Sequence, residues 1–305
     1  MKFFYNLPEG SPKKQELLRI ILNYVANKGY ETIKIDSLLS EKFLNKNKSE
    51  NVLISFCTGE GSRGKRKDIY DFFISKKFPV IIIDRNYFCF DRLNTDHSSI
   101  RIQLNSLYEE ETEILYDKPI ENRWKKMVEK YNLELKPWRK NGDYIMVMIN
   151  NTSGNMNSSK AIYDYYSTIL NTIPKYTKRK ILLFTHSAEI CDENTLLRNI
   201  IFDRNKVEFF YKKDFSAYLK NCWAFVTRNS SSSLYAIING IPIFVSNKKQ
   251  PFSVSLGLTD LSKIEEPYMP ENREEILNML SHRIWFKNEI DIFGEKILNK
   301  LKQFL

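Results

Sequence analysis

The stretch Cys222–Pro251, CWAFVTRNSSSSLYAIINGIPIFVSNKKQP, decides how this chain folds. It contains a short apolar run at residues 223–226 and then a polar turn, RNSSSS, at residues 228–233. An apolar helical turn follows and ends at Gly240, and a second apolar run occupies residues 242–245. Two strands joined through a helix form a right-handed crossover in a parallel sheet. The stretch therefore predicts an α/β fold in which a helix begins at the carboxyl edge of the sheet.

The polar turn is expected at the edge where open α/β sheets bind their ligands. Its side chains offer hydrogen-bond donors that suit a phosphate, and a guanidinium adds a permanent positive charge. These candidate ligand-binding residues are Arg228, Asn229, Ser230, Ser231, Ser232 and Ser233. The alternative is an ordinary crossover helix with a serine N-cap and a polar turn before it. Local residues alone support the two interpretations equally.

The order of residues in this stretch resembles the donor-side, C-terminal domain of GT-B glycosyltransferases, especially capsule-type and bacteriophage enzymes. The residues that carry the resemblance are Asn229, Ser230–Ser233, Ala236, Gly240 and Pro242. It implies an α/β fold of two Rossmann-like, doubly wound domains that face each other across a cleft, with C-terminal helices crossing back to the first domain. It also implies that the serine-rich turn holds the diphosphate of a nucleotide-sugar, most simply a UDP-sugar, as co-substrate, with no tightly bound cofactor.

Length and composition agree with two globular domains. The chain has 305 residues, of which 42% are hydrophobic, so two domains of about 150 residues are expected. We expect an acceptor-side domain at residues 1–130, a nucleotide-sugar-binding domain at 131–285 and a returning helix at 286–305. No run reaches about 18 apolar residues, which predicts no membrane span, and the apolar start before Pro8 is too short for a signal peptide. Four scattered cysteines indicate reduced thiols and a cytoplasmic location.

Apolar runs separated by helix-compatible sequence predict the strands of both domains. In the first half they lie at residues 2–5, 32–35, 51–56 and 78–83, with a helix that begins at Pro12. In the second half they lie at 144–149, 180–185 and 206–210, before the runs already described. A short helix is expected at 214–219, irregular chain at 251–266, and a long helical stretch from Asn272 through Ile284 to Phe293.

Two carboxylates in the first half are candidates for a catalytic base. Asp84 ends the strand at 78–83, and the passage from there to Asn105 resembles phage-encoded glycosyltransferase-like proteins, with Asp84 in place of their glutamate and Asn86 in place of their glycine. The resemblance implies that this carboxylate accepts the proton of an acceptor hydroxyl. The alternative is a turn cap or a pair with Arg85. Glu60, in the glycine-rich loop after the strand at 51–56, is the second candidate.

Two further segments of the second half are implicated by the resemblance. Thr152 and Ser153 belong to the loop after the first strand of that half, which approaches the donor diphosphate in GT-B enzymes. His186 follows the strand at 180–185, where capsule-type families place a histidine that faces the donor phosphate, although Ser187 replaces their proline. A histidine with a structural hydrogen bond is the alternative at this position.

A net charge of +10 favours polyanionic partners, although a lysine-rich composition bias accounts for it equally well. The phage resemblance implies double-stranded DNA with a hydroxymethylated pyrimidine as acceptor. The phosphate-contacting candidates are then Arg63, Lys65, Arg66, Lys67, Lys248 and Lys249. A saccharide or glycan acceptor, a non-catalytic nucleic-acid-binding protein on a GT-B scaffold, and a sugar-nucleotide epimerase are the alternatives. Zinc, calcium, P-loop and DxD motifs are absent from the sequence, so chemistry without a metal is expected.

Overall fold

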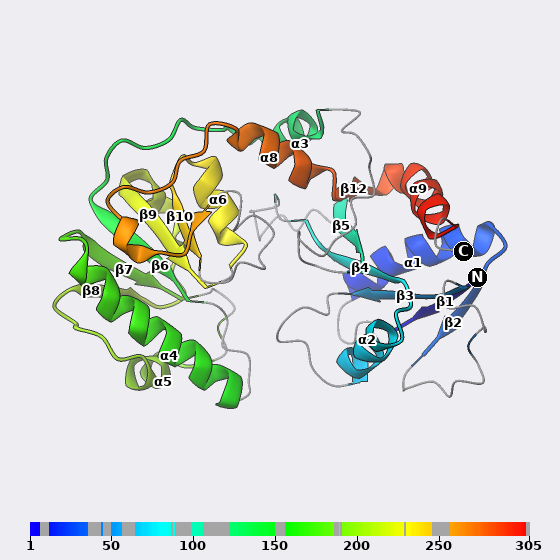
Figure 1. Ribbon diagram of the computed structural model, residues 1–305, viewed down its shortest axis with the longest axis horizontal. Helices are drawn as coiled ribbons and strands as arrows, with labels where there is room; N and C mark the ends of the chain where they lie inside the picture. The colour runs from blue at the N-terminus through cyan, green and yellow to red at the C-terminus, as the bar shows by residue number, and fades with distance from the viewer. Residues whose placement is uncertain are drawn as a thin grey trace. The chain divides into compact units, whose positions relative to one another are not determined.

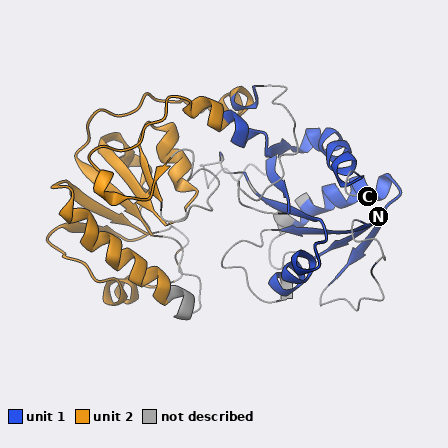
Figure 2. Cartoon of the chain, in the orientation of Figure 1, with its two compact units in different colours: residues 1–124, 278–305 blue, residues 125–277 orange. Residues whose placement is uncertain are grey.

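The computed structural model describes residues 1–6, 12–35, 44, 50–56, 65–86, 88, 99–105, 122–149, 156–185, 189, 191–228, 230–245 and 257–302. The chain forms two compact units, residues 1–124 with 278–305 (unit 1) and residues 125–277 (unit 2), as Figure 2 shows. It passes from unit 1 to unit 2 within helix α3 (Arg123–Tyr131) and returns within helix α8 (Arg273–Ser281). The C-terminal helix therefore belongs to the first unit, as the resemblance implied.

Unit 2 contains a fully parallel, doubly wound sheet (Figure 1). Its strands are β6 (Tyr144–Met148), β7 (Lys180–Phe184), β8 (Val207–Phe210), β9 (Cys222–Thr227), β10 (Ile243–Val245) and β11 (Gly257–Leu258). They lie in the order β11-β10-β9-β6-β7-β8, and every pair is parallel. The chain winds outward from β6 in one direction and then from β9 in the other. The topological switch point, where doubly wound sheets bind their ligands, therefore lies between the carboxyl ends of β6 and β9.

The four inner strands of unit 2, β6, β7, β9 and β10, are buried on both faces, which explains why they appear in the sequence as continuous apolar runs. Helices α4 (Met156–Thr172), α5 (Glu193–Asn199) and α6 (Ser232–Ile238) cover the sheet. The β9–α6–β10 crossover confirms the unit predicted from residues 222–245. The helix expected at 214–219 is a 3-10 helix, η5 (Ser216–Asn221), and the segment expected to be irregular contains β11 and a second 3-10 helix, η6 (Leu261–Lys263). A short 3-10 helix, η4 (Ile173–Lys175), extends α4.

Unit 1 contains a mixed sheet rather than a purely parallel one. Its strands are β1 (Lys2–Tyr5), β2 (Glu31–Lys34), β3 (Asn51–Phe56), β4 (Val80–Arg85), β5 (Ser99–Leu104) and β12 (Ile284–Phe286), in the order β12-β5-β4-β3-β1-β2. The pairs β1–β2, β1–β3 and β3–β4 are parallel, whereas β5 is antiparallel to both β4 and β12. The switch point of this sheet lies between the carboxyl ends of β1 and β3.

The prediction of one long helical stretch after Asn272 is wrong. Helix α8 ends at Ser281, strand β12 follows, and after the 3-10 helix η7 (Lys287–Glu289) helix α9 (Ile290–Lys302) begins. The apolar spacing in this region fits a helix, but the segment is too short to fix its type. Pairing of Ile284 with Arg101 and of Trp285 with Ile100 at the edge of the sheet decides it in favour of a strand.

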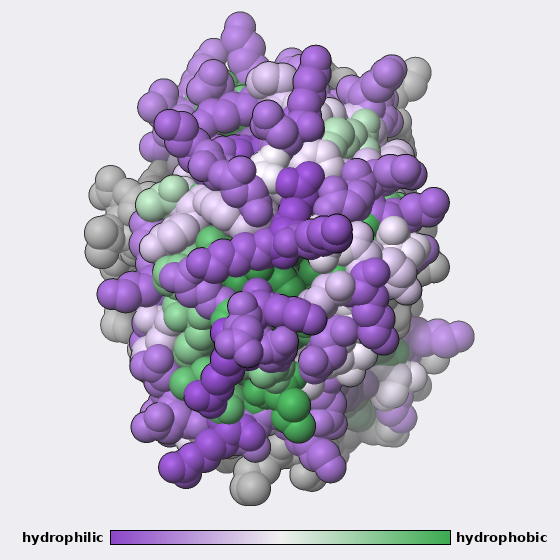
Figure 3. All heavy atoms as spheres, turned by 90° about the vertical axis from the view of Figure 1, so that its left-hand side faces the viewer, coloured by the Kyte–Doolittle hydropathy of each residue, from purple (hydrophilic) through white to green (hydrophobic). Residues whose placement is uncertain are grey.

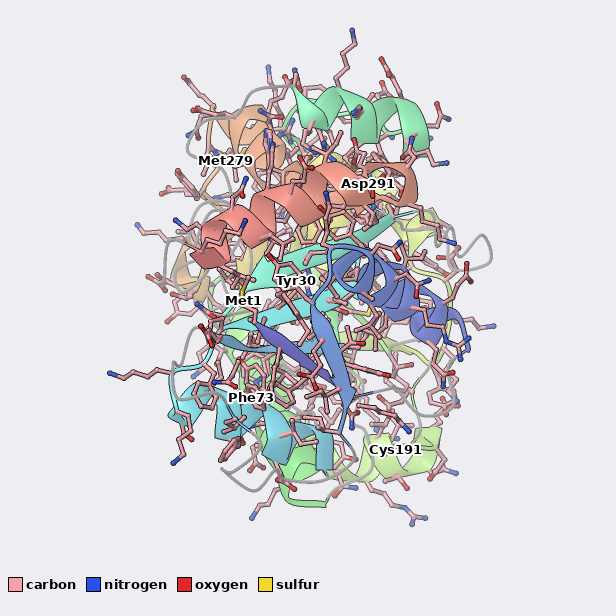
Figure 4. All side chains as sticks on the ribbon, turned by 90° about the vertical axis from the view of Figure 1, so that its right-hand side faces the viewer. Met1, Tyr30, Phe73, Cys191, Met279 and Asp291 are labelled. Atoms are coloured by element: carbon pink, nitrogen blue, oxygen red, sulfur yellow. The ribbon has the colours of Figure 1, made fainter. Side chains whose placement is uncertain are left out.

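Helices cover both faces of the unit 1 sheet, as Figure 4 shows with Asp291 of α9 and Phe73 of α2 on opposite sides. Helices α1 (Pro12–Asn27) and α9 pack on one face, and α2 (Lys65–Ser75) packs on the other. Gly294 lets α9 approach α1 closely, because a Cβ at this position would collide with the Tyr24 ring. This close approach fixes the returning C-terminal helix on unit 1.

The face drawn in Figure 3 is mainly hydrophilic, with apolar areas between its hydrophilic side chains. Exposed large apolar side chains among the described residues are Ile74, Tyr176, Ile201, Tyr268, Met279 and Ile292. Within the described part of the chain, every helix is too short or too polar to cross a membrane.

Burial should make the thiol of Cys222 inert. This side chain is fully buried at the start of β9, and burial raises the pKa of Cys222 to about 12. The unfolded thiol ionises near an ordinary pKa of about 8.5, so the unfolded state loses its proton first as pH rises. This group therefore lowers the free energy of unfolding between those two pH values. We expect iodoacetamide at about pH 8 to label Cys222 only after unfolding, and half-buried Cys191 earlier. Mass spectrometry measures both, and rapid native labelling of Cys222 would contradict the assignment.

Candidate functional site

The carboxyl ends of β6 and β9 are joined by side-chain hydrogen bonds at the switch point of unit 2. The Met148 carbonyl, at the end of β6, accepts one bond from the Thr227 hydroxyl (3.0 Å) and one from the Tyr166 hydroxyl (2.7 Å). The Arg228 backbone N–H donates to the same Tyr166 oxygen (3.3 Å). Tyr166 and Thr227 are fully buried. The start of the polar turn is therefore fixed relative to β6, the strand that precedes Thr152 and Ser153 in the sequence.

The serines of the turn differ in what their hydroxyl groups do. Ser233 is buried and donates to the Ser230 carbonyl (2.7 Å), so its hydroxyl holds the turn together. The Ser230 and Ser232 hydroxyls, both half-buried, are 2.6 Å apart and hydrogen-bonded to each other. Ser231 is exposed at the N-cap of α6, and its side chain makes no capping hydrogen bond. Ser231 is therefore the serine whose hydroxyl is best placed to meet a ligand.

The opposite end of α6 is held by residues from two distant segments. The Ile238 carbonyl accepts from the Lys136 backbone N–H (2.9 Å), and the Ile237 carbonyl accepts from the Arg273 guanidinium (3.0 Å). Gly240 follows with a positive φ of 73°, and a Cβ there would collide with the Pro137 carbonyl oxygen. This end of the helix therefore requires a glycine both for its backbone conformation and for the close approach of the neighbouring chain.

Several candidates lie outside the described residues, namely Glu60, Arg63, Thr152, Ser153, His186, Asn229, Lys248 and Lys249. The side chains of Lys65 and Arg66, in the first turn of α2, are also outside them. The strands that lead to these segments are described: β3 ends at the switch point of unit 1, and β6 and β7 are neighbours in unit 2. The Lys67 ammonium forms an exposed ion pair with Asp71, one turn later on α2.

In unit 1, Asp84 forms an ion pair with Arg101, the residue directly opposite it on β5. The Arg101 and Asp84 side chains are 9% and 20% exposed. The neighbouring Asn86 side chain is also bonded on both sides, because its amide donates to the Ser99 hydroxyl (3.0 Å) and its oxygen accepts from the Phe88 N–H (2.8 Å). Strand β5, which supplies Arg101 and Ser99, was not predicted from the sequence. Its residues are all buried, as are those of β3 and β9.

The ion pair gives Asp84 a structural role that can be separated from a catalytic one. We expect Asp84→Ala to lower the free energy of unfolding by about 3 kcal/mol, because it leaves the Arg101 charge buried without this carboxylate. The double variant Asp84→Ala/Arg101→Met should recover part of the loss, since it removes both charges. Thermal unfolding measures this. An unchanged melting temperature in Asp84→Ala would exclude the structural role.

Among the described residues, no group of three or more histidine, cysteine, aspartate or glutamate side chains gathers in a way that could hold a metal ion. The candidate site built from the described residues consists of Arg228, the serines of the polar turn (Ser230–Ser233, the serine turn) and the hydrogen bonds that join β6 to β9. Its chemistry is that of hydroxyl and guanidinium donors at the carboxyl edge of a parallel sheet, which suits a phosphate group.

Solved structures show which fold this is. The chain is similar to the structure "Thermosulfurimonas dismutans KpsC, beta Kdo 2,7 transferase", with 14% identity over 98% of this chain and 100% of that one and a TM-score of 0.53. It is also similar to "Thermosulfurimonas dismutans KpsC, beta Kdo 2,4 transferase", with 9% identity over 97% of each chain and a TM-score of 0.51. No protein-family model and no curated protein matches the sequence. Each of the two units contains a Rossmann-like sheet, and the C-terminal segment of the chain returns to unit 1. This is the GT-B fold that the resemblance implied.

Proposed function

We propose that the chain is a glycosyltransferase that moves a sugar from a nucleotide-sugar to a hydroxyl acceptor. The observation that carries the proposal is the position of the serine turn, at the switch point of the second sheet of a GT-B fold. Two Kdo transferases have the same fold over their whole length, which supports a sugar-transfer reaction. The donor diphosphate binds at the end of β9, where Arg228 and the hydroxyls of Ser230, Ser231 and Ser232 surround it.

The reaction breaks the bond between the anomeric carbon and the diphosphate, and it forms a bond from the same carbon to the acceptor oxygen. Negative charge develops on the leaving diphosphate, and hydroxyl and guanidinium donors that are already oriented stabilise it. The acceptor proton passes to a base, for which Asp84 and Glu60 are the proposed carboxylates. Thr152, Ser153, His186 and Asn229 are proposed to complete the donor site.

A panel of nucleotide-sugars tests the donor half of this proposal. A donor present at 100 times its dissociation constant raises the free energy of unfolding by about 2.7 kcal/mol, which a thermal-shift measurement detects. We expect one nucleotide-sugar, with a UDP-sugar as the first candidate, to stabilise the protein while its free sugar does not. Slow release of nucleotide with water as acceptor would support transfer. Conversion of the donor into an isomeric nucleotide-sugar would instead identify an epimerase, and the absence of any stabilising donor would contradict the proposal.

For the acceptor, we propose a finer hypothesis, hydroxymethylated pyrimidine in double-stranded DNA. The net charge of +10 supports it, because a protein that neutralises phosphates releases counterions. Arg63, Lys65, Arg66, Lys67, Lys248 and Lys249 are the proposed contacts. We expect the affinity for a modified duplex to fall steeply with salt, and sugar to be transferred to it. Salt-independent binding, or transfer only to a saccharide, would exclude DNA as the acceptor, and DNA binding without any donor binding would indicate a non-catalytic protein.

A further inference from the structure

The Arg273 guanidinium is buried in unit 2, and its described hydrogen bonds go to backbone carbonyls. Its side chain is at the first residue of α8, and the residue is only 6% exposed. One nitrogen donates to the Ile237 carbonyl in the last turn of α6 (3.0 Å), and another donates to the Lys136 carbonyl (2.5 Å). The guanidinium also stacks on the Trp138 ring, 4.1 Å from its centre. Burial lowers the pKa of Arg273 to about 10, which leaves the group charged at neutral pH.

The last-turn carbonyls of a helix carry the negative end of its dipole, so they stabilise this guanidinium together with the charge of the adjacent Glu274 carboxylate. Two further hydrogen bonds link the segments that surround the guanidinium. Trp138 donates from its indole nitrogen to the Pro270 carbonyl (3.1 Å), just before α8, and the Lys136 N–H donates to the Ile238 carbonyl of α6. Arg273 therefore joins α6, the segment that follows α3, and the start of α8.

Helix α6 connects the contacts around Arg273 to the candidate donor site. Its seven residues span only about 10 Å, and the serine turn stands at its other end. Leu234, Ala236 and Ile237 are buried in the core of unit 2, so the helix shifts as one body when its end is displaced. A change in the position of the Ile237 carbonyl is thus carried to Ser231.

We propose that Arg273 is a positioning residue for nucleotide-sugar binding, which acts on the serine turn through the C-terminal end of α6. The inference rests on the proposed function. Arg273 itself does not contact the donor. Lysine cannot replace it fully, because only a planar, forked side chain bonds two carbonyls while it stacks on an indole ring.

Unit 2 offers a matched control in Arg179. This arginine also stacks on a tryptophan, Trp223, at 4.8 Å, and it donates to a backbone carbonyl, that of Gly142. It pairs with Glu265 and precedes β7, at the amino edge of the sheet, so none of its described contacts involves α6. Arg179→Gln should therefore lower stability without changing the position of the serine turn.

The test measures the dissociation constant of the stabilising nucleotide-sugar by calorimetry for wild type, Arg273→Gln, Arg273→Lys and Arg179→Gln. We expect Arg273→Gln to weaken binding by about tenfold or more, Arg273→Lys to weaken it less, and Arg179→Gln to stay within about twofold of wild type. Hydrogen exchange should show faster exchange of the α6 amides in Arg273→Gln only.

Each outcome decides the proposal. Wild-type affinity in Arg273→Gln, or equal loss in Arg179→Gln, overturns it while the proposed function stands. If the wild-type protein binds no nucleotide-sugar, the proposed function fails, and the positioning role fails with it. If Arg273→Gln does not fold, Arg273→Lys gives the same comparison, and unchanged affinity and unchanged α6 exchange in that variant overturn the proposal.

Discussion

Replacing Ser231 with aspartate should weaken nucleotide-sugar binding by roughly a hundredfold or more while it leaves the fold intact. Ser231 is exposed at the N-cap of α6 and makes no capping bond, so a carboxylate fits there without disturbing buried groups. An aspartate there lies at the positive end of the α6 dipole, so the melting temperature should stay equal or rise slightly. Two like charges 4 Å apart near a protein surface repel by about 4 kcal/mol, which corresponds to a loss well above a hundredfold.

Ser231→Asn is the control for this substitution, because asparagine has nearly the same shape as aspartate but no charge. We expect its dissociation constant to stay within about tenfold of wild type, since asparagine keeps a hydrogen-bond donor. Titration calorimetry with the same donor measures both variants. Equal binding by Ser231→Asp and wild type would place the diphosphate elsewhere.

Breaking the ion pair between Arg123 and Glu289 should have the largest effect on stability. Both residues are nearly buried, and the guanidinium donates to both carboxylate oxygens (3.3 and 2.7 Å) and to the Ile284 carbonyl (2.6 Å). It also lies 5.0 Å from the centre of the Trp285 ring. We expect Arg123→Ala to lower the free energy of unfolding by about 4 kcal/mol and the melting temperature by about 10 °C, because Glu289 keeps its charge without this partner.

An exposed ion pair on the same segment is the control. Lys287 pairs with Glu16, and the two side chains are 36% and 59% exposed. Exposed pairs contribute about 0–1 kcal/mol, so Lys287→Ala should shift the melting temperature by only about 2 °C or less. Calorimetry of both variants measures the difference. A similar shift in the two variants would show that Arg123 does not hold the returning segment on unit 1.

The sequence predicts the strands that appear in it as continuous apolar runs, whereas β5, whose residues alternate between apolar and polar, was not predicted although it is buried. Strands β1 and β3 and the β9–α6–β10 crossover follow directly from continuous apolar runs bounded by polar turns, and the motif around Ser230–Ser233 leads to the GT-B fold. Strand β12 does not follow. Three residues between two helices have no period of their own, and only pairing with β5 makes them a strand. Tertiary contacts thus decide the antiparallel edge of unit 1.

The candidate site follows from the sequence only in part. The serine turn is visible in the sequence as a motif. Which of its hydroxyls are structural and which are exposed depends on backbone geometry: Ser233 bonds the turn itself, and Ser231 is exposed. The roles of Tyr166 and Arg273 were not predicted, because each side chain bonds a carbonyl far away in the chain, that of Met148 and that of Ile237 respectively. A tyrosine or arginine on an amphipathic helix carries no sign of such a partner. The role of Glu289 likewise depends on a distant residue, because its carboxylate pairs with Arg123.

We propose above all that a nucleotide-sugar diphosphate binds at the switch point between β6 and β9. Hydrogen exchange with and without saturating nucleotide-sugar tests it most directly, because it reports both the binding and its place along the chain. We predict slower exchange in peptides that contain the end of β9 and the start of α6, from Arg228 to Leu234. Slower exchange confined to unit 1, with the Arg228–Leu234 peptides unchanged, would contradict the claim.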